Sequence, residues 1–219
     1  MASIYENAYL TLAATKARGC NEGLYNATNN HAPRALNAIG RDGNMLSRYV
    51  QRFFPLLSRA WVLQERLLSP RILHFGPAEL LWEYCECSTC ECRHEETQPA
   101  DNTPYPKIQY AACLDPRSTE SRPTMWRSIA YAYSQLGITY PSDRLPGLRG
   151  VAMQLFGDNP RSKVISGLWE DTMLLDLMWE ANGENHESMK LVLPNIPSWS
   201  WATMATRVRY QFSATRDKS

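Results

Sequence analysis

The sequence predicts an α+β domain in which helices and short strands mix within one compact unit. Helical periodicity covers residues 55–69 and 125–136, whereas alternation typical of strands occurs at residues 71–84 and 198–212. The two kinds of segment do not follow a regular strand–helix–strand rhythm, which argues against a parallel α/β fold. Seven Trp and eleven Tyr indicate a well-packed core, because large rings bury much surface.

The first fifty residues are expected to contribute little regular structure. Residues 3–9 resemble a short helix, and residues 9–15 are apolar and β-branched enough to form a buried strand. Gly19 and Gly23 interrupt the pattern that follows. Residues 26–50 are rich in Asn, Gly and polar side chains and are expected to form a loop.

Residues 55–69 form the clearest predicted helix. At 100° per residue its apolar side chains fall within one arc of about 160°: Leu56, Leu57, Ala60, Leu63, Leu67 and Leu68. Gln64 lies near the centre of this arc, so we expect it to be buried and hydrogen-bonded, since an unsatisfied buried amide costs roughly 1–3 kcal/mol. Glu65 is expected at the rim, Arg66 on the opposite polar side, and Pro70 at the end of the helix.

Trp61 is expected to fill core volume beside this arc. Truncating a buried Trp to Ala typically costs about 3–5 kcal/mol. We therefore expect Trp61→Ala to destabilise the protein more than Gln64→Leu.

Gly and Pro residues mark the boundaries of the remaining predicted elements. Residues 71–75 and 79–84 flank Gly76-Pro77 and predict a hairpin that ends in a Cys-rich segment. Residues 93–124 are polar and Pro-rich and are expected to form a long loop. Further helices and terminal strands are expected over residues 125–136, 142–156, 168–179, 198–201 and 208–212. Ser142 and Asp143 are suitable caps for the second of these helices.

Charge and hydropathy exclude several classes of protein. The net charge is +1, from 23 basic and 22 acidic residues without a concentrated basic block, so we expect no binding to nucleic acid. No apolar run reaches the roughly 18–20 residues that a membrane helix needs, and the first residues do not resemble a secretory signal. We therefore expect a soluble, cytoplasmic protein whose cysteines are mostly reduced.

Four cysteines within eight residues form the one cluster with ligand chemistry. They are Cys85, Cys87, Cys90 and Cys92. Thiolates are preferred zinc ligands, but a mononuclear site usually joins two separated pairs, and only Cys87 and Cys90 have C-x2-C spacing. Three interpretations stay open: reduced thiols at the end of a strand, a zinc site, and a redox disulfide. No other cofactor is expected.

Familiar catalytic motifs do not occur in the sequence: no G-x-S-x-G elbow, phosphate-binding loop, dinucleotide fingerprint or H-E-x-x-H is found. The four histidines are not at helical spacing: His31, His74, His94 and His186. His74 lies in a predicted strand and is expected to be a satisfied core or rim side chain. Cys20 or Cys113 with a distant His remains an alternative nucleophile pair. Three carboxylates are well placed for chemistry, but each has a structural explanation. Glu65 can form an ion pair at the rim, Glu83 can pair within a strand, and Asp143 can cap a helix.

The most specific motif lies at residues 59–71, RAWVLQERLLSPR. It matches the pattern RxWxxQExxLSPR of fungal heterokaryon incompatibility (HET) domains, through Arg59, Trp61, Gln64, Glu65 and Arg71. Residues 4–15, IYENAYLTLAAT, are similar to the IYxxAxLTIAAT segment found late in these domains.

The resemblance continues in the family's order towards residue 210. Residues 81–85, with Trp82 and Glu83, resemble the WEC motif, and residues 140–148, with Asp143, resemble YxSDRLPAL. The segment GLW at residues 167–169 and the segment PSWSWA at residues 197–202 also have family counterparts. The second of these contains Trp199 and Trp201.

This resemblance implies a division into residues 1–75, the later part of a HET domain, and residues 76–219, the region that follows it. The opening ALSYxWG-like and xDxxCINQ-like segments do not occur here, so the resemblance implies a truncated domain without its N-terminal α/β half. It also implies a role in fungal non-self recognition and programmed cell death through a protein partner. The alternatives are an enzyme, either NAD-cleaving like some TIR-type domains or recruited to metabolism, and an inactive fragment.

Overall fold

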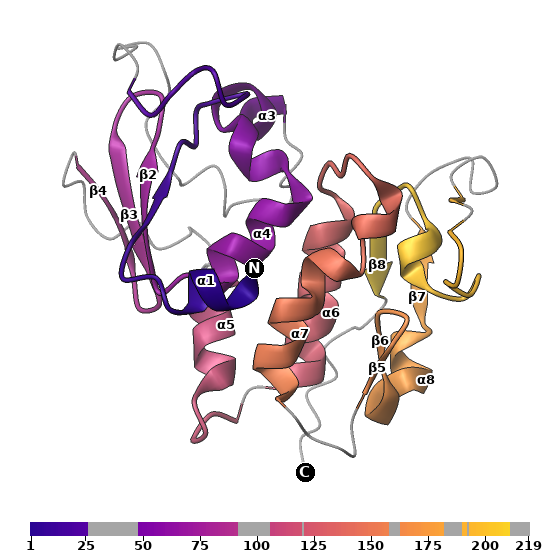
Figure 1. Ribbon diagram of the computed structural model, residues 1–219. Helices are drawn as coiled ribbons and strands as arrows, with labels where there is room; N and C mark the ends of the chain where they lie inside the picture. Colours follow the sequence, from indigo (N-terminus) through magenta and orange to yellow (C-terminus); the bar gives the residue numbers. More distant parts are fainter. Residues whose placement is uncertain are drawn as a thin grey trace.

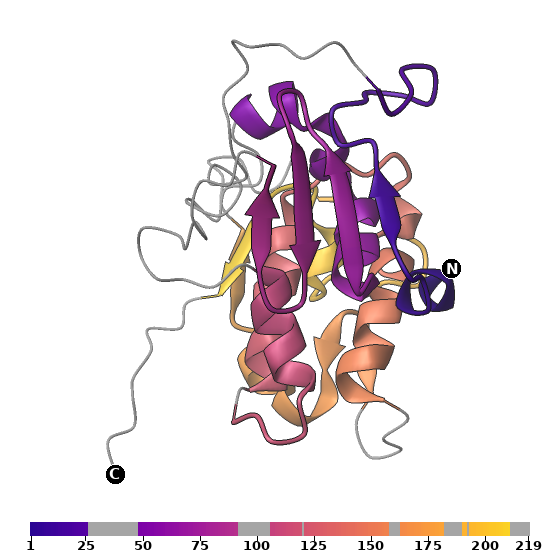
Figure 2. The same cartoon turned by 90° about the vertical axis from the view of Figure 1, so that its left-hand side faces the viewer.

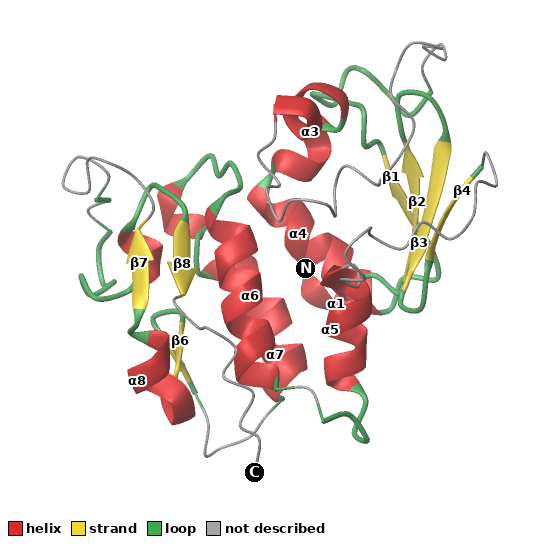
Figure 3. Ribbon diagram, turned by 180° about the vertical axis from the view of Figure 1, so that it is seen from behind, coloured by secondary structure: helices red, strands yellow, loops and turns green. Residues whose placement is uncertain are grey.

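Sheet, helices and two small β-ribbons lie in successive layers in the computed structural model (Figure 1). The structure describes residues 1–25, 48–91, 106–119, 121–157, 163–181, 190–191 and 193–210. The predicted α+β class is confirmed, and the elements form one compact unit. A four-stranded sheet flanks the central helices on one side, and the β-ribbons with α8 flank them on the other (Figure 3).

The sheet has the strand order β1-β2-β3-β4. Strand β1 (Thr11–Ala13) pairs in parallel with β2 (Arg71–Phe75), while β3 (Leu80–Tyr84) and β4 (Ser88–Cys90) complete an antiparallel meander (Figure 2). The predicted hairpin is confirmed. The prediction that the first strand is buried is wrong, because β1 lies at the edge and Leu12 is 52% exposed.

One face of the sheet packs against the helices. Alternation along β2 and β3 directs Ile72, His74, Leu81 and Glu83 to this face, where all four are buried. Two of these positions are polar or ionisable, so the buried face requires internal partners for them.

The predicted helix over residues 55–69 is divided into two parts. A 3₁₀ turn (Pro55–Ser58) is followed by α4 (Ala60–Leu68), with Arg59 extended between them. Gly137 explains the break: its carbonyl accepts from the Ala60 N–H at 2.8 Å, and its N–H donates to the Ser58 carbonyl at 2.8 Å. The end of the helix before Pro70 is confirmed.

Two loop predictions are wrong where the structure describes them. Residues 48–53 form α3 (Arg48–Phe53), and α5 (Pro106–Leu114) lies inside the predicted long loop over residues 93–124. Prolines at 106 and 123 mark helix starts and not loops, because the first turn tolerates a residue without an N–H. Residues 26–47 and 92–105 lie outside the described part.

Helices α6 (Arg122–Ser134) and α7 (Arg149–Phe156) follow, and the short α1 (Ala2–Glu6) packs against α4 and α7. Ser121 caps α6 by accepting from the Thr124 N–H. Two 3₁₀ turns, Pro141–Asp143 and Pro146–Leu148, precede α7. The expected caps are absent at this point, since neither Ser142 nor Asp143 caps a helix with its side chain.

The prediction of one helix over residues 168–179 is wrong. Strands β5 (Val164–Ile165) and β6 (Leu168–Trp169) form a hairpin, followed by a 3₁₀ turn (Glu170–Thr172), α8 (Met173–Asp176) and β7 (Trp179–Ala181). The hairpin turn consists of Ser166 and Gly167, both with positive φ, which fits the primed turns that join such strands.

The C-terminal strand prediction is half right. Strand β8 (Val208–Tyr210) pairs antiparallel with β7, as expected for a terminal strand. The alternating residues 198–201 instead lead into a 3₁₀ turn (Trp201–Thr203), so the strand predicted there is wrong. Phe212, which belongs to the predicted strand over 208–212, lies outside the described part.

Helix α4 lies at the centre of a core that includes residues from both sides of position 75. The division at residue 75 falls at the end of β2, in the turn of the β2–β3 hairpin. Trp61 is only half-buried and lies outside this core, contrary to expectation. Among the described residues no helix is long and apolar enough to cross a membrane.

Candidate functional site

Gln64 connects α4 to the beginning of α7. Its Oε1 accepts from the Gly150 N–H at 2.9 Å, and its side chain is buried. The first N–H groups of a helix have no partner within that helix, so Gln64 satisfies one of them. The prediction that this amide is buried and bonded is therefore confirmed.

Position 150 requires glycine because α1 and α4 approach the backbone of α7 closely at this contact. A Cβ at this position would lie 2.5 Å from the Cβ of Ala2 and 2.9 Å from Gln64 Oε1. Glycine thus allows α7 to pack closely against α1 and α4.

Arg66 is buried, although the helical pattern placed it on the polar side of α4. It is 5% exposed, and its guanidinium donates to both carboxylate oxygens of Glu83 at 2.6–3.0 Å. The expectation was wrong because the partner stands on β3, seventeen positions later in the chain. Helical periodicity within α4 contains no information about that strand.

Glu83 is the centre of a polar cluster between the sheet and the helices. His74 Nε2 lies 3.0 Å from Glu83 Oε2, and His74 Nδ1 lies 2.9 Å from the hydroxyl of Thr15. A neutral ring satisfies both contacts if Nε2–H donates to Glu83 and Nδ1 accepts from Thr15. We call Thr15, Arg66, His74, Glu83 and Lys107 the Glu83 cluster.

The order hydroxyl, imidazole and carboxylate resembles a catalytic triad. Thr15, His74 and Glu83 are, however, 0–1% exposed. A nucleophile needs space beside it for the reacting carbon, and these residues have no access to solvent. The arrangement therefore fixes the segment after β1 against β2 and β3. The predicted role of His74 as a satisfied core side chain is confirmed, whereas its contact with Thr15 was not foreseen.

Electrostatics within the cluster favour an ionised Glu83 and a neutral His74. Burial alone would raise the pKa of Glu83, but the charge of Arg66 and the hydrogen bonds from His74 and Arg66 outweigh it and hold the pKa well below its usual value. Burial lowers the pKa of His74 against the attraction of Glu83, and Arg66 and Lys107 lower it further.

Lys107 brings an uncompensated charge to this cluster. The side chain is 1% exposed, and Nζ has no hydrogen-bond partner within the described part of the chain. Burial lowers its pKa to about 8, with Arg66 acting in the same direction and Glu83 opposing it. Lys107 also lies in the first turn of α5, where the helix dipole disfavours a cation.

The other residues that carry the resemblance are dispersed over the fold. Glu65 is half-buried at the rim as expected, where burial raises its pKa and a hydrogen bond from Tyr5 opposes the rise. Arg71 is exposed and lies over the ring of Tyr9. The remaining motif residues do not converge with these: Arg59 is exposed, Trp82 and Asp143 are half-buried, Trp199 is 40% exposed and Trp201 is fully buried.

A second buried ion pair connects α6 to α8. Asp176 is fully buried and accepts from Arg127 at 2.7 Å, from the Trp169 N–H at 2.7 Å and from the Thr172 hydroxyl at 3.2 Å. Sequence reasoning missed this pair, because residues 168–179 were expected to form one helix. The available signal was Asp176, the one charged side chain between Met173 and Trp179.

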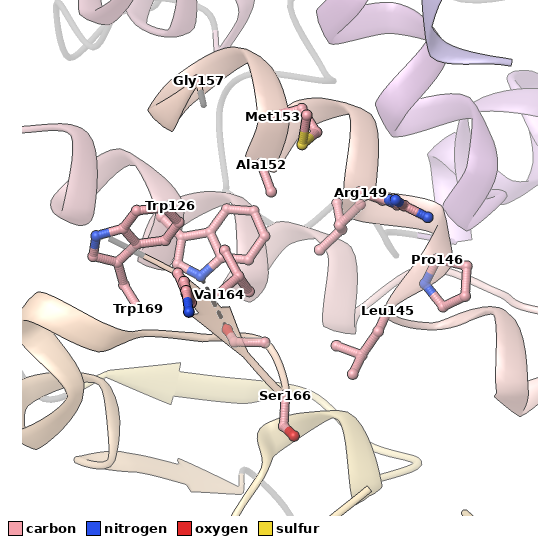
Figure 4. Close-up of a pocket in the computed structure, with 13 residues that line it drawn as sticks. Trp126, Leu145, Pro146, Arg149, Ala152, Met153, Gly157, Val164, Ser166 and Trp169 are labelled. Carbon is pink, nitrogen blue, oxygen red and sulfur yellow. Dashed lines mark hydrogen bonds between the residues drawn. The ribbon is translucent and has the colours of Figure 1, made fainter. Parts of the chain in front are cut away.

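A pocket of about 530 Å³ opens between α7 and the β5–β6 hairpin (Figure 4). Trp126, Leu148 and Trp169 line it but are almost fully buried. Figure 4 shows the two indoles together at one end, with Arg149 and Pro146 at the other end and Ala152 and Met153 on α7 above. No acidic side chain is among its thirteen described lining residues. The sequence analysis did not identify this pocket.

The predicted cysteine site is only partly described. Cys85 and Cys87 form no disulfide, and the Cys85 thiol donates to the Pro70 carbonyl at 3.7 Å. Within the described residues no group of three or more ligand side chains is placed to hold a metal. The side chain of Cys90 and the whole of Cys92 lie outside that part, so zinc stays a prediction. His31, His94 and His186 also lie outside it, and the cysteine–histidine nucleophile pair likewise stays a prediction.

Two arrangements therefore stand out in the geometry, the buried Glu83 cluster and the open pocket beside Trp126 and Trp169. The first is inaccessible and structural, while the second is accessible and mostly apolar. Comparison of the chain with models of protein families, with curated proteins and with solved structures gave no match.

Proposed function

We propose that this chain is an incompatibility-type protein of filamentous fungi, which acts in non-self recognition and cell-death signalling through contact with a protein partner. The observation that carries the proposal is the position of residues 59–71, the run that resembles the HET motif most closely. Within this run Gln64, a fixed position of the motif, bonds to Gly150. Arg66 and the backbone of Ala60, at variable positions, bond to Glu83 and Gly137. The run thus anchors α4 to distant parts of the fold, which supports a motif that serves the fold and not catalysis.

Solvent accessibility supports a function through contact with a protein partner and not through catalysis. The described triad-like residues are closed to solvent, whereas residues 174–178 expose several apolar side chains: Leu174, Leu175, Leu177 and Met178. Exposed apolar patches of this kind mark protein interaction sites. We therefore place the partner's contact on this segment, which we call the α8 surface.

Expression in a filamentous fungus tests the proposal. The chain is placed under an inducible promoter, and dead cells are counted by uptake of an impermeant dye. We expect induction to raise cell death, and a fluorescent fusion to be distributed through the cytoplasm. A folded chain that accumulates without loss of viability, in strains of different incompatibility type, would contradict the proposal.

A matched pair of variants tests the α8 surface. Leu174→Glu and Tyr25→Glu each add one charge at an apolar side chain of equal exposure, 82% and 83%. We expect Leu174→Glu to abolish cell death and Tyr25→Glu to preserve it, with unchanged thermal melts for both. Equal killing by the two variants would exclude the α8 surface as the contact.

The enzyme alternative predicts a different result. Purified chain incubated with NAD is expected to release no nicotinamide, because the described imidazole-containing cluster admits no substrate. Clear turnover would overturn the contact mechanism. A cooperative thermal transition is also expected, and its absence would favour an inactive fragment.

A further inference from the structure

The free polar groups around the pocket beside Trp126 and Trp169 are donors. Arg149 and Lys163 are exposed on its rim, and neither forms an ion pair with any described residue. No carboxylate of the described chain lines the pocket to neutralise them. A ligand that enters here therefore meets positive charge at the rim and apolar surface below it.

The backbone acceptors of the hairpin turn are already used. The Gly167 carbonyl accepts from the indole N–H groups of both Trp126 and Trp201, at 3.0 Å each. The Ser166 carbonyl accepts from the Ser200 hydroxyl at 2.6 Å. A ligand that relied on donating hydrogen bonds would find these acceptors occupied, so the pocket favours a ligand that accepts them.

Both the size and the walls of the pocket define the body of the ligand. A volume of about 530 Å³ lies within the usual range for small-molecule sites, about 300–1,000 Å³. Trp126 and Trp169 are only 1% and 3% exposed, and the ring of Trp169 stacks on Phe156, so the two indoles offer little surface to a ligand. The accessible wall is aliphatic, with Leu145, Ala152 and Met153.

We propose that this pocket binds a small organic anion with an apolar body, such as a carboxylate on a hydrocarbon skeleton. The body lies against the aliphatic wall, and the carboxylate accepts hydrogen bonds at the rim from Arg149 or Lys163. This site is separate from the α8 surface, and the proposal stands whether or not the chain signals in incompatibility.

Three probes that differ in charge and in ring content test the proposal. Their binding is measured by calorimetry and by NMR of the indole N–H resonances. Naphthalene-2-carboxylate is the expected ligand, 2-naphthalenemethanol is its uncharged counterpart, and inorganic phosphate carries charge without a ring. We expect saturable binding of the carboxylate with shifts at the Trp126 and Trp169 resonances. The alcohol should bind about two- to fivefold more weakly, which is the range expected for one exposed charge contact. Phosphate should leave both resonances unchanged.

Variants separate the rim from the wall. Arg149→Ala with Lys163→Ala is expected to reduce affinity for the carboxylate to that for the alcohol. The control pair Lys16→Ala with Arg18→Ala removes the same charge away from the pocket and should leave the affinity unchanged. Ala152→Phe fills the pocket from α7 and should abolish binding of both naphthalene probes.

Two results would overturn the proposal, and the rim variants decide it even if Ala152→Phe does not fold. One is equal affinity for the carboxylate and the alcohol, which would show that charge has no part in recognition. The other is binding that persists unchanged in the rim variants or in folded Ala152→Phe protein, which would place the probe elsewhere.

Discussion

Replacing Lys107 by Met is expected to stabilise the protein, although it removes a buried side chain. Met keeps the unbranched shape of the lysine stem and removes the ammonium group. That group is buried without a hydrogen-bond partner among the described residues and lies in the first turn of α5. A buried, unsatisfied polar group costs about 1–3 kcal/mol, and more when it is charged.

The perturbed pKa gives the magnitude. A shift from 10.5 to about 8 corresponds to about 3 kcal/mol of preference for the neutral form in the folded state. Replacement by Met recovers at most this amount at pH 7, because packing of the thioether is imperfect. We therefore expect a gain of about 1–3 kcal/mol in the free energy of unfolding.

The sign of the pH dependence provides an independent check. Between pH 8 and pH 10 the unfolded lysine keeps a proton that the folded one has lost, so the unfolding free energy of the wild type should rise with pH. Above pH 10 the buried tyrosines act in the opposite direction, because burial raises their pKa and only their unfolded forms ionise.

Urea denaturation at pH 7, 8, 9 and 10 measures both effects. Lys107→Met should have the higher midpoint at pH 7 and should lack the rise between pH 8 and pH 10. Lys163→Met, at an exposed lysine, is the control and should keep the rise. A destabilised Lys107→Met protein, or one that keeps the rise, would refute the reasoning.

Other substitutions test the buried contacts. Glu83→Gln should cost about 3–5 kcal/mol, since it breaks a buried ion pair; this contribution is present above the unfolded pKa near 4.5 and is lost as pH falls towards the lower folded pKa. Urea midpoints should therefore fall as the pH is lowered from 6 to 2 for the wild type, and should fall less for the variant, which keeps the contribution of Asp115. Gln64→Leu should cost about 1–3 kcal/mol and more than Trp61→Ala, because Trp61 is half-buried; the reverse order of guanidinium midpoints would restore Trp61 to the core. Gly167→Ala, at φ +88, should lower stability by about 1–3 kcal/mol, whereas Gly19→Ala, with open space around it, should shift the melting temperature little.

The sequence predicted those features that depend on one secondary-structure element or on two adjacent ones. The apolar arc of α4 identified Gln64 as buried and bonded, and alternation with Gly76-Pro77 identified the hairpin. The partner of Gln64, the Gly150 N–H, was not predictable, because it depends on how α7 packs. Arg66 was misplaced for the same reason, since its partner belongs to a strand.

The errors among the secondary elements have local causes. Prolines were interpreted as loop signals where they occupy the first turns of α5 and α6. The apolar segment after Gly167 contains both the strand β6 and the helix α8, and a 3₁₀ turn at Glu170–Thr172 separates them. Short apolar runs do not distinguish strand from helix by periodicity alone.

The buried contacts of α4 change where function should be sought. Gln64 satisfies an N–H of α7 and Arg66 a carboxylate of β3, so both side chains are constrained by the need to hold three elements together. Such positions are constrained whatever the protein binds. Residues that are free to determine specificity are those with no internal partner to satisfy. Leu174 on the α8 surface is exposed, the pocket cations Arg149 and Lys163 form no ion pair with any residue that the structure describes, and all three lie outside the run at 59–71.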